Sequence, residues 1–442
     1  MSSKVAGVDT STQSCKVIVW DPQTGQVVRE GTAPHPEGTE VDPQAWWEAF
    51  CVAAQAAGGL DDVAALSVAG QQHGLVLLDA DGAVIRPALL WNDTRSAQAA
   101  SELVAELGAD TWIQATGSVP VASLTVAKLR WVATHEPEAL ARTAAICLPH
   151  DWLSWRLLGS QQLADLYTDR SDASGTGYLD VHTATYRHDL LAHALGSSPT
   201  AVTALQLPRV VAPAAVAGQV ARAVPEIGLR AGTLLGPGCG DNAGAALGLD
   251  LQPGQASVSL GTSGVVAVVS REPVLDPHGV VTGFMDATGH YLPLACTLNG
   301  ARVMSATAAL LGVSLAEFDE LALSVPDTGG LQLTPYFEGE RTPNLPDATA
   351  SLTGMTLQNW RPAPLARAAV QGLCDLLAGA AAAIQACGVE LDRVKLVGGG
   401  ANSPAVRALL SAALGVPVDV PAPGQYVALG AAKQAAAVLH HH

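Results

Sequence analysis

Aromatic, basic and charged residues are all scarce in this 442-residue sequence. Aromatic side chains make up 4% of the chain and charged side chains 14%. Lysine and arginine number 23 against 40 aspartates and glutamates, a net charge of −17, and the basic residues are scattered. Scattered and outnumbered cations cannot form the basic face that a phosphate backbone or an anionic lipid surface requires. The composition therefore argues against nucleic-acid and membrane partners.

The sequence also lacks metal-binding cysteine spacing and long apolar runs. Its seven cysteines are dispersed without a CxxC or Cys/His pattern, which favours reduced, mostly buried thiols and no structural metal. No stretch reaches 18 uninterrupted apolar residues, and the N-terminal segment passes directly into a strand pattern instead of a signal peptide. We therefore expect a cytoplasmic protein. The terminal residues 440–442 are three histidines, which we interpret as a tag remnant.

Two halves of the chain open with the same pattern. Val5 to Asp9 and Lys16 to Trp20 are strand-like and flank a turn rich in Ser and Thr, and Ala256 to Leu260 and Val265 to Ser270 repeat this design. A chain of this length exceeds what one hydrophobic core usually organises. We expect two α/β domains, residues 1–244 and 245–439.

Strand and helix patterns alternate within each half. We expect mixed sheets covered by helices. The predicted strands are Val63–Ala69, Val84–Trp91 and Val394–Val397, and the predicted helices are Ser96–Leu107, Val126–His135, Leu365–Cys387 and one that starts at Pro404 after Ser403 as N-cap.

The turn after the first strand is a candidate phosphate site. Asp9 ends that strand, and its carboxylate can hold Mg²⁺ while the hydroxyls and N–H groups of the turn, Thr12 among them, face a phosphate. The turn Gly261 to Gly264 in the second half, with Thr262, offers similar groups without a repelling charge. An ordinary Asx-turn is the alternative for Asp9.

A glycine-rich loop precedes Asp241. The run Gly236 to Gly240 leaves a short strand and presents Asp241 at an expected helix start, where the helix dipole favours an ionised carboxylate. An ionised carboxylate can act as a base. A plain N-cap is the alternative.

A second glycine run, Gly398 to Gly400, follows a strand and precedes a helix, so its backbone can approach a nucleotide. The chain has neither the GxxxxGK[ST] pattern nor a full GxGxxG spacing, which disfavours P-loop and Rossmann enzymes. A tight structural turn is the alternative for this run.

Polar groups follow two further strands. Gln72 and His73 end one, and Trp91 begins the run Trp-Asn-Asp-Thr-Arg at the end of the next. A tryptophan beside hydrogen-bonding groups suits a sugar, which packs its C–H face on the ring. The alternatives are a satisfied strand-end histidine, a core tryptophan, and an Asp93–Arg95 ion pair that positions the loop.

These motifs, in this order, resemble the FGGY carbohydrate kinase family over essentially the whole chain. Ser123 to His135 matches the first signature of the family, and Ala350 to Met355 resembles the start of the second, in which Pro364 is a departure. Tyr336 to Pro343 is similar to a stretch found in members that act on D-xylulose. Further departures are Gln72, where methionine is frequent, and Ser11 and Ser14, which replace glycines.

The resemblance implies two actin-like (ribonuclease H-like) α/β ATPase domains around a central cleft. It implies that Asp241 is the catalytic proton acceptor and also contacts substrate, that Asp9 is the metal-associated residue, and that the sugar is contacted by Gln72, His73 and Trp91. It implies that the nucleotide is held by Thr12, Gly261, Thr262, Gly399, Gly400 and Asn402.

The activity implied is ATP- and Mg²⁺-dependent transfer of a phosphoryl group to an alcohol group of a ketopentose, D-xylulose, giving D-xylulose 5-phosphate, as in xylose metabolism. The partners implied are the sugar and ATP, with a homodimer as a compatible assembly. The alternatives are a kinase of the same family acting on ribulose, gluconate or a deoxysugar, and a non-catalytic actin-like sugar sensor.

Overall fold

The structure, a computed structural model, describes residues 4–440. The chain divides into two compact units that are not continuous in sequence. Unit 1 takes the chain up to Asp250, the segment Gly283–Tyr291 and the stretch from Gly424 onward, and unit 2 takes Leu251–Thr282 and Leu292–Pro423. The predicted division into residues 1–244 and 245–439 differs from these units, because the C-terminal helix packs on the first sheet and not on the second.

Within residues 4–440, a seven-stranded sheet forms the centre of unit 1, with the order β11, β12, β5, β1, β2, β3 and with β13 also paired to β5. Strands β1 and β5 run parallel, and β1, β2 and β3 form an antiparallel meander. Its strands are β1 (Lys4–Thr10), β2 (Ser14–Asp21), β3 (Gln26–Pro34), β5 (Val63–Gly70), β11 (Gly218–Gln219), β12 (Leu234–Leu235) and β13 (Cys239–Gly240).

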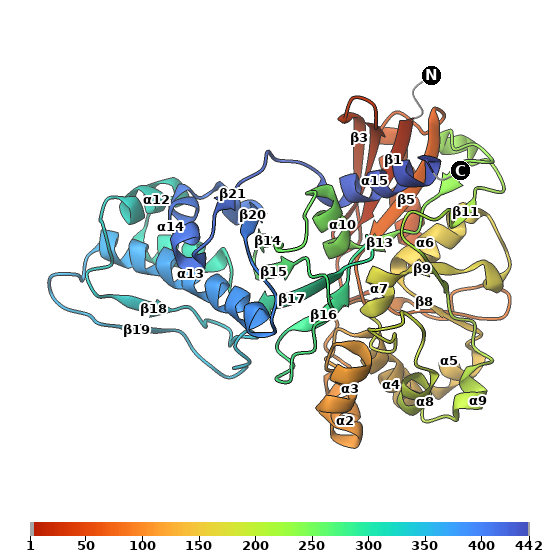
Figure 1. The fold of residues 1–442 in the computed structure, drawn as a ribbon, viewed down its shortest axis with the longest axis horizontal. Coiled ribbons are helices and arrows are strands. Elements are labelled where there is room, and N and C mark those ends of the chain that lie inside the picture. The colour runs from red at the N-terminus through yellow and green to blue at the C-terminus, as the bar shows by residue number, and fades with distance from the viewer. Residues whose placement is uncertain (1–3, 441–442) are drawn as a thin grey trace. The chain divides into compact units, whose positions relative to one another are not determined.

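Alternating side chains on β1 and β2 bury both faces of this sheet. Val17 and Val19 pack with helix α1 (Pro43–Ala56) on one face, while Val5 and Ile18 pack with helix α15 (Tyr426–His440) on the other. Figure 1 shows α15 lying along β1 and β5. The period of two in the strand sequence thus creates two cores from one sheet.

The remaining elements of unit 1 are short pieces between and beyond these strands. The strands are β4 (Glu40–Val41), β6 (Val76–Leu78), β7 (Ala88–Leu89), β8 (Ala145–Cys147), β9 (Tyr167–Asp169) and β10 (Arg209–Val211). The helices are α2 (Ala97–Leu107), α3 (Ala109–Thr116), α4 (Thr125–His135), α5 (Pro137–Arg142), α6 (Pro149–Leu158), α7 (Arg170–Ser174), α8 (His188–Ala194), α9 (Pro199–Val202) and α10 (Asp241–Gly248), with single 3₁₀ turns at Leu163–Asp165 and Pro225–Ile227.

Glycines allow α10 and α15 to pack backbone to backbone. A Cβ at Gly248 would lie 1.9 Å from the carbonyl oxygen of Tyr426, and one at Gly430 would lie 1.9 Å from that of Gly244. Any side chain at these positions would force the helices apart. The close packing holds the helix that begins at Asp241 against the sheet.

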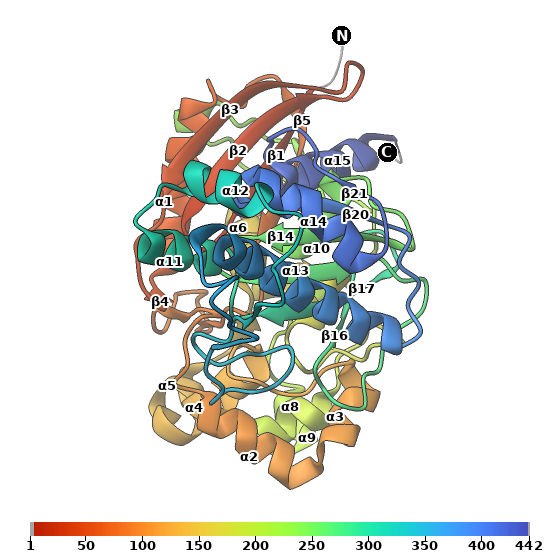
Figure 2. The same ribbon diagram turned by 90° about the vertical axis from the view of Figure 1, so that its left-hand side faces the viewer.

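Unit 2 is built on a sheet with the order β16, β17, β15, β14, β20, β21, six strands within the described residues. Helices α13 and α14 pack against each other, as Figure 2 shows, and enclose an apolar core with β14, β15 and β20. Its strands are β14 (Gln255–Leu260), β15 (Gly264–Val268), β17 (Tyr291–Thr297), β20 (Arg393–Val397) and β21 (Val418–Asp419), and its helices are α11 (Arg302–Leu311), α12 (Leu315–Leu323), α13 (Pro362–Ala386) and α14 (Pro404–Leu414). The end strand of this sheet, β16 (Thr282–Met285), belongs to unit 1 from Gly283 onward.

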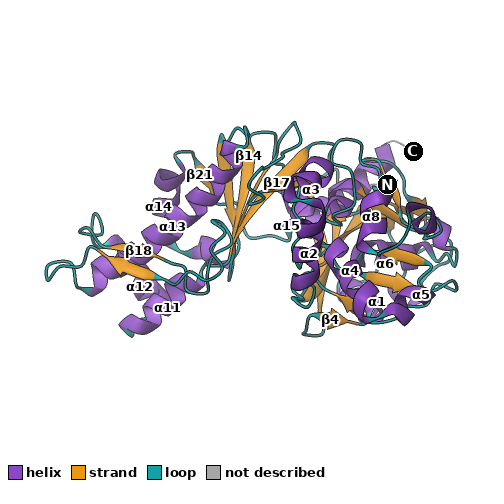
Figure 3. Cartoon of the chain, turned by 90° about the horizontal axis from the view of Figure 1, so that it is seen from below, coloured by secondary structure: helices purple, strands orange, loops and turns teal. Residues whose placement is uncertain are grey.

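A two-stranded ribbon, β18 (Gln332–Thr334) with β19 (Ser351–Thr353), packs against α13 and can be followed beside the purple helices in Figure 3. Helix α13 is long and apolar enough to cross a membrane by length and composition. However, 61% of its most apolar 18-residue window is buried inside the protein, and its Leu373 and Leu377 belong to the unit 2 core. This is the pattern of a core helix.

Most of the predicted elements are present. The two strand-turn-strand openings, the helices after Ser96 and after Ser403, and the strand before Gly398 all form, and Ser403 caps α14 by accepting a hydrogen bond from the Val406 N–H at 3.1 Å. The predicted strand Val84–Trp91 was wrong over most of its length, since only Ala88–Leu89 is a strand. Pro87 lacks the N–H that a longer ladder would need.

Candidate active site

The first hairpin holds Asp9 in a buried position at the end of β1. In the antiparallel register Asp9 faces Lys16, whose Nζ lies 3.5 Å from Asp9 Oδ2, and the Ser11 hydroxyl donates to Asp9 Oδ1. Burial raises the pKa of Asp9, and the hydrogen bond from Ser11 and the charge of Lys16 oppose the rise. Because burial disfavours the ionised form of Asp9, a bound cation would stabilise this carboxylate.

Two side chains brace the turn of this hairpin. His35 Nδ1 lies 2.8 Å from the carbonyl oxygen of Ser11, and Trp91 Nε1 donates to Thr12 Oγ1 at 2.8 Å. Trp91 is 44% exposed, so the alternative of a core tryptophan was wrong. The structure thereby joins a predicted sugar-binding residue to a predicted phosphate-binding residue.

The loop after Trp91 contains the Asp93–Arg95 ion pair, which the sequence analysis gave as one of the alternatives. Arg95 Nε lies 2.9 Å from Asp93 Oδ1, and Thr39 Oγ1 donates to Asp93 Oδ2 at 2.8 Å. Asp93 is buried, and although desolvation opposes it, the hydrogen bonds from Arg95 and Thr39 lower its pKa. Asp93 thus positions the loop in an ionised state.

Strand register brings Asp9 and Asp241 to the same edge of the sheet. Ala69 on β5 pairs with Asp9 on one side and with Cys239 on the other, and the chain reaches Asp241 two residues later. Asp241 is the first residue of α10, and Gly240 occupies the N-cap. The alternative of an N-cap aspartate was therefore wrong.

The ionisation state expected for Asp241 also needs correction. Burial, and next the charge of Asp9, raise the pKa of Asp241 to about 7, while backbone N–H groups at the helix start lower it by less. The helix start favours the anion, as predicted, but desolvation dominates. A carboxylate with this pKa is poised to accept a proton near neutral pH.

Asn242, which sequence reasoning did not single out, links Asp241 to the end of β5. Its side-chain Nδ2 donates to Asp241 Oδ1 at 2.9 Å and to Gln72 Oε1 at 3.3 Å. Gln72 is 5% exposed and donates through Nε2 to the carbonyl oxygen of Ser171 at 3.2 Å. The only sequence signal for Asn242 was its position directly after Asp241.

His73 adopts an unusual backbone conformation at this edge. Its φ is +69°, a left-handed value that a residue with a Cβ adopts at a cost and that clusters at functional sites. Its Nδ1 lies 2.7 Å from the carbonyl oxygen of Gly175, which requires a proton on Nδ1. Its ring lies 5.4 Å from that of Phe284 at 41°, within unit 1. In the neutral ring, Nε2 is then a hydrogen-bond acceptor.

In unit 2, two of the predicted loops follow neighbouring strands. Strand β14 pairs in parallel with β20, so the turn Gly261–Gly264 and the run Gly398–Gly400 leave the same edge. A Cβ at Gly398 would lie 2.7 Å from the carbonyl oxygen of Leu260, which shows how closely the loops approach. Gly399 to Asn402 forms a 3₁₀ turn that leads into α14. The loop that contains Thr262 and the loop that contains Gly399, Gly400 and Asn402 therefore leave neighbouring strands at one edge of the sheet.

A buried carboxylate supports the turn of the second hairpin. Glu340 is 1% exposed and accepts hydrogen bonds from the Leu298 N–H at 2.6 Å and from Asn299 Nδ2 at 2.9 Å. The segment it holds continues to Ala301, whose N–H donates to the Gly261 carbonyl at 2.8 Å. The sequence analysis placed Glu340 in the family-like stretch Tyr336 to Pro343 but did not predict that it supports this turn.

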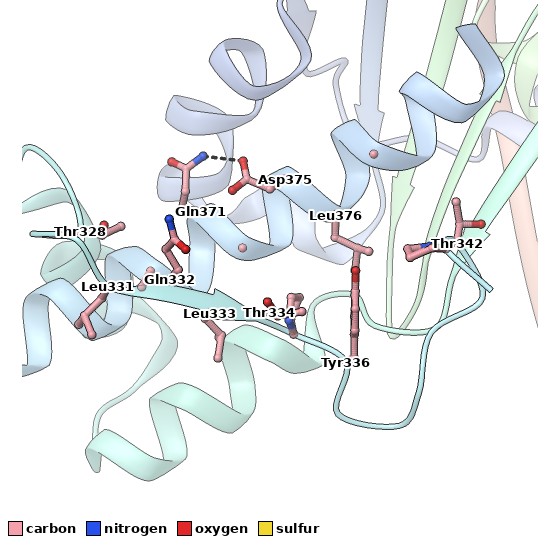
Figure 4. A pocket seen from close by; sticks show the side chains of 15 residues that line it. Thr328, Leu331, Gln332, Leu333, Thr334, Tyr336, Thr342, Gln371, Asp375 and Leu376 are labelled. Atoms are coloured by element: carbon pink, nitrogen blue, oxygen red, sulfur yellow. Dashed lines mark hydrogen bonds between the residues drawn. The ribbon is translucent and has the colours of Figure 1, made fainter. Parts of the chain in front are cut away.

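Both ends of that stretch border a cavity of about 490 Å³ between α13 and the β18–β19 ribbon (Figure 4). Tyr336 and Thr342 line it opposite Gln371 and Asp375, which are joined by a hydrogen bond of 2.8 Å on α13. Its lining includes none of the predicted site residues. The cavity is therefore distinct from the two loops predicted to hold phosphate.

Comparison with known proteins shows the family of this chain. The FGGY family of carbohydrate kinases matches the chain with its N-terminal domain over residues 5–248 and its C-terminal domain over residues 256–439. The chain belongs to this family. It is a two-domain, actin-like FGGY kinase, a phosphotransferase that uses ATP to phosphorylate an alcohol group of a sugar, as the resemblance predicted.

Individual relatives of this FGGY kinase are similar over nearly their whole length. A xylulose kinase of Streptomyces rubiginosus is 45% identical over 98% of this chain and 88% of its own, and one of Escherichia coli is 36% identical over 97% and 89%. The crystal structure of xylulose kinase from Bifidobacterium adolescentis matches with a TM-score of 0.93 at 48% identity, covering 100% of this chain and 93% of that one.

Proposed function

We propose that this FGGY kinase transfers the γ-phosphoryl group of ATP to the 5-hydroxyl of D-xylulose, giving D-xylulose 5-phosphate. The observation that carries the proposal is the shared edge of β1, β5 and β13, where a carboxyl with a pKa of about 7 lies beside the hydrogen-bonded pair Gln72 and Asn242. The names of relatives that are 45% and 48% identical support the choice of sugar.

On the acceptor side, Asp241 accepts the proton of the attacking hydroxyl. Its raised pKa matches a base that works near neutral pH. His73 accepts a hydrogen bond from a sugar hydroxyl through Nε2, because its Nδ1–H is committed to Gly175. Gln72 and the half-exposed ring of Trp91 provide further polar and stacking contacts.

On the nucleotide side, the loops of unit 2 hold ATP through backbone N–H groups and hydroxyls. Gly261 and Thr262 contact phosphate oxygens, and Gly399, Gly400 and Asn402 lie against the adenosine. Thr12 in the first hairpin contributes a hydroxyl to the transferred phosphoryl group. Phosphoryl transfer of this kind relies on positioning and on stabilisation of charge more than on covalent chemistry.

The residues at the first hairpin fit a magnesium ion. Asp9 is a buried carboxylate with a raised pKa and lies close enough to Asp241 to raise the pKa of that group, and the buried Thr10 Oγ1 has no hydrogen-bond partner among the described residues. Oxygen donors of this kind suit Mg²⁺, held by Asp9 through water. When bound, the ion offsets charge on the phosphate oxygens. The chain itself orients the acceptor and takes up its proton.

The test is an ADP-release assay over D-xylulose, D-ribulose, gluconate, glycerol and aldopentoses, with and without Mg²⁺. We expect the highest kcat/KM for D-xylulose and no turnover without the metal ion. A higher kcat/KM for another sugar would replace the substrate assignment. A folded protein that binds ATP and phosphorylates none of the sugars would instead favour a sugar sensor.

A gluconate kinase of Lactobacillus acidophilus matches at a TM-score of 0.89 but only 23% identity, which shows the fold alone. It therefore gives no support to gluconate over xylulose.

We further propose that the enzyme acts in the cytoplasm and forms a homodimer. Sedimentation velocity, with an expected mass of twice 45.1 kDa, tests the dimer.

A further inference from the structure

Helix α7 contacts three separate parts of the candidate active site, although no motif pointed to it. The Ser171 carbonyl accepts from Gln72, the Ser171 hydroxyl accepts from the Gly240 N–H at 3.1 Å, and the carbonyl of Gly175, directly after the helix, lies 2.7 Å from His73 Nδ1. Figure 1 shows α7 beside β13. Helix α7 and the residue after it thus provide hydrogen-bond partners for Gln72, for His73 and for Gly240, the residue before the base.

A helix of five residues is not held in place by its own hydrogen bonds. Asp169 caps it by accepting from the N–H groups of Ser171 and Asp172 at 2.8 and 2.9 Å. Asp172 itself is fully buried, and its Oδ2 lies 2.7 Å from Nδ1 of His150 on α6. This pair therefore tethers α7 to α6, in addition to the bonds that Ser171 makes with Gln72 and Gly240.

The surroundings of His150 fix its charge state. Nδ1 faces the carboxylates of Asp172 and, at 3.1 Å, Asp151, while Nε2 lies 3.4 Å from the Pro237 carbonyl oxygen. Because both ring nitrogens face oxygen atoms, the site favours a doubly protonated ring, although burial also raises the pKa of Asp151 to about 7 and that of Asp172 to about 6. Accordingly, although desolvation opposes it, the carboxylates of Asp151 and Asp172 raise the pKa of His150 to about 10. The three side chains are spaced like metal ligands, but the imidazolium is itself the cation.

His150 also packs directly against the backbone that carries the site. A Cβ at Gly238, whose φ is +83°, would lie 2.3 Å from His150 Nε2, and one at Gly70 would lie 2.7 Å from His150 Cβ. Gly70 ends β5 just before Gln72, and Gly238 precedes Asp241 by three residues. The imidazolium thus fills the space between the two segments that hold sugar-binding residues and base.

We propose that His150 is a positioning residue of the reaction. Its buried imidazolium connects Asp172 on α7 with Pro237 in the loop before Asp241, and so fixes the base, Gln72 and His73 in one arrangement. This inference rests on the proposed roles of those three residues. His150 does not touch substrate. Its loss misplaces the groups that do, and a misplacement of about 1 Å can lower the rate about 100-fold.

The experiment compares His150→Gln, Asp172→Asn and the double variant with the parent. We expect each single variant to lower kcat/KM for D-xylulose about 10- to 100-fold, while the dissociation constant for ATP measured by calorimetry stays within about twofold, since the nucleotide loops lie in unit 2. Because the two residues act as one tether, the double variant should lose no more than the worse single variant. An additive loss contradicts the proposal.

Ser171→Ala covers the case in which the charge variants do not fold. It keeps both charges and removes only the hydroxyl that accepts the Gly240 N–H, so the fold should persist while kcat falls about fivefold or more. Arg29→Gln is the control, because the Arg29–Asp62 pair at 2.5 Å contacts none of the candidate site residues. It should keep parental kinetics.

Parental kcat/KM for the sugar in a folded His150→Gln protein overturns the proposal, and so does an unchanged kcat in Ser171→Ala. Equal losses in sugar kinetics and ATP affinity also overturn it, because they indicate general loosening. If the parent does not phosphorylate D-xylulose, the proposed substrate fails separately. The tether is then measured with whichever sugar of the panel the parent phosphorylates fastest.

Discussion

The two candidate ligand-binding regions differ in the source of their polar groups. At the edge of β1, β5 and β13 in unit 1, they are side chains that can carry charge, including the buried Asp9 and the partly buried His73 and Asp241. In unit 2, the loops Gly261–Gly264 and Gly398–Asn402 contain no ionisable side chain and offer backbone and hydroxyl groups. The difference follows from the chemistry. Taking up a proton requires a tuned pKa, whereas holding phosphate requires fixed donors.

The largest effect should come from removing the base. Asp241→Asn keeps the shape of the side chain, and we expect it to lower kcat about 10²- to 10⁴-fold, because a positioned general base typically contributes that much. Calorimetry should still detect D-xylulose binding. A folded variant with more than a tenth of the parental kcat would make Asp241 a structural residue.

The next effect concerns the metal ion. Asp9→Asn keeps a side chain that Ser11 can contact but removes the charge, and a metal-orienting residue typically contributes 10- to 100-fold to affinity or activity. We therefore expect the Mg²⁺ concentration for half-maximal rate to rise about 10- to 100-fold. Asp62→Asn, in an ion pair with Lys4 and Arg29, is the matched control. Equal Mg²⁺ requirements in both variants would contradict the metal assignment.

The third prediction separates the two regions directly. His73→Ala should lower kcat/KM for D-xylulose about 5- to 150-fold, since an unpaired buried polar group costs about 1 to 3 kcal/mol. The KM for ATP should stay near its parental value. Thr262→Val should do the reverse and raise the KM for ATP alone. If His73→Ala impaired ATP binding and spared the sugar, the two regions would have exchanged roles.

The smallest effect tests the nucleotide loop. A Cβ at Gly399 would meet nothing within 4 Å, so Gly399→Ala should leave the melting temperature unchanged. If adenosine occupies that space, the methyl group should raise the KM for ATP roughly fivefold, equivalent to about 1 kcal/mol. Gly379→Ala on α13, equally free of neighbours within 4 Å, should leave the KM unchanged. An unchanged KM in Gly399→Ala would remove this loop from the nucleotide site.

Much of the fold could be predicted from local patterns. The β-branched runs around Asp9 and around Gly261 are strands, because strand period and turn chemistry are encoded over a few neighbouring residues. The turns between them lie where predicted but are shorter, at residues 11–13 and 261–263. The segment Val84–Trp91 was misread because its run of apolar residues resembles a strand, whereas Pro87 lacks the N–H that a longer ladder needs and Val84 and Ile85 are only partly buried.

The candidate site could be predicted only in part. Asp9, Gln72, His73 and Asp241 were all singled out because each ends a strand or a glycine run. The tether between His150 and Asp172 could not be predicted, because the two residues are 22 positions apart and come into contact only when α6 and α7 pack together. The pKa of Asp241 could not be predicted either, because it depends on burial and on the charge of Asp9, and neither effect follows from a local sequence pattern.

The pH dependence of kcat/KM for D-xylulose, measured at saturating Mg²⁺ and ATP in the parent and in Asp241→Asn, tests the central claim most directly. The base must be deprotonated, and its pKa is raised to about 7, so the parental value should be highest above that pH and should fall as pH decreases. A bound cation would lower the midpoint without removing the fall. The residual activity of Asp241→Asn should not show this fall. Parallel profiles in the two proteins would contradict the assignment of Asp241 as the base.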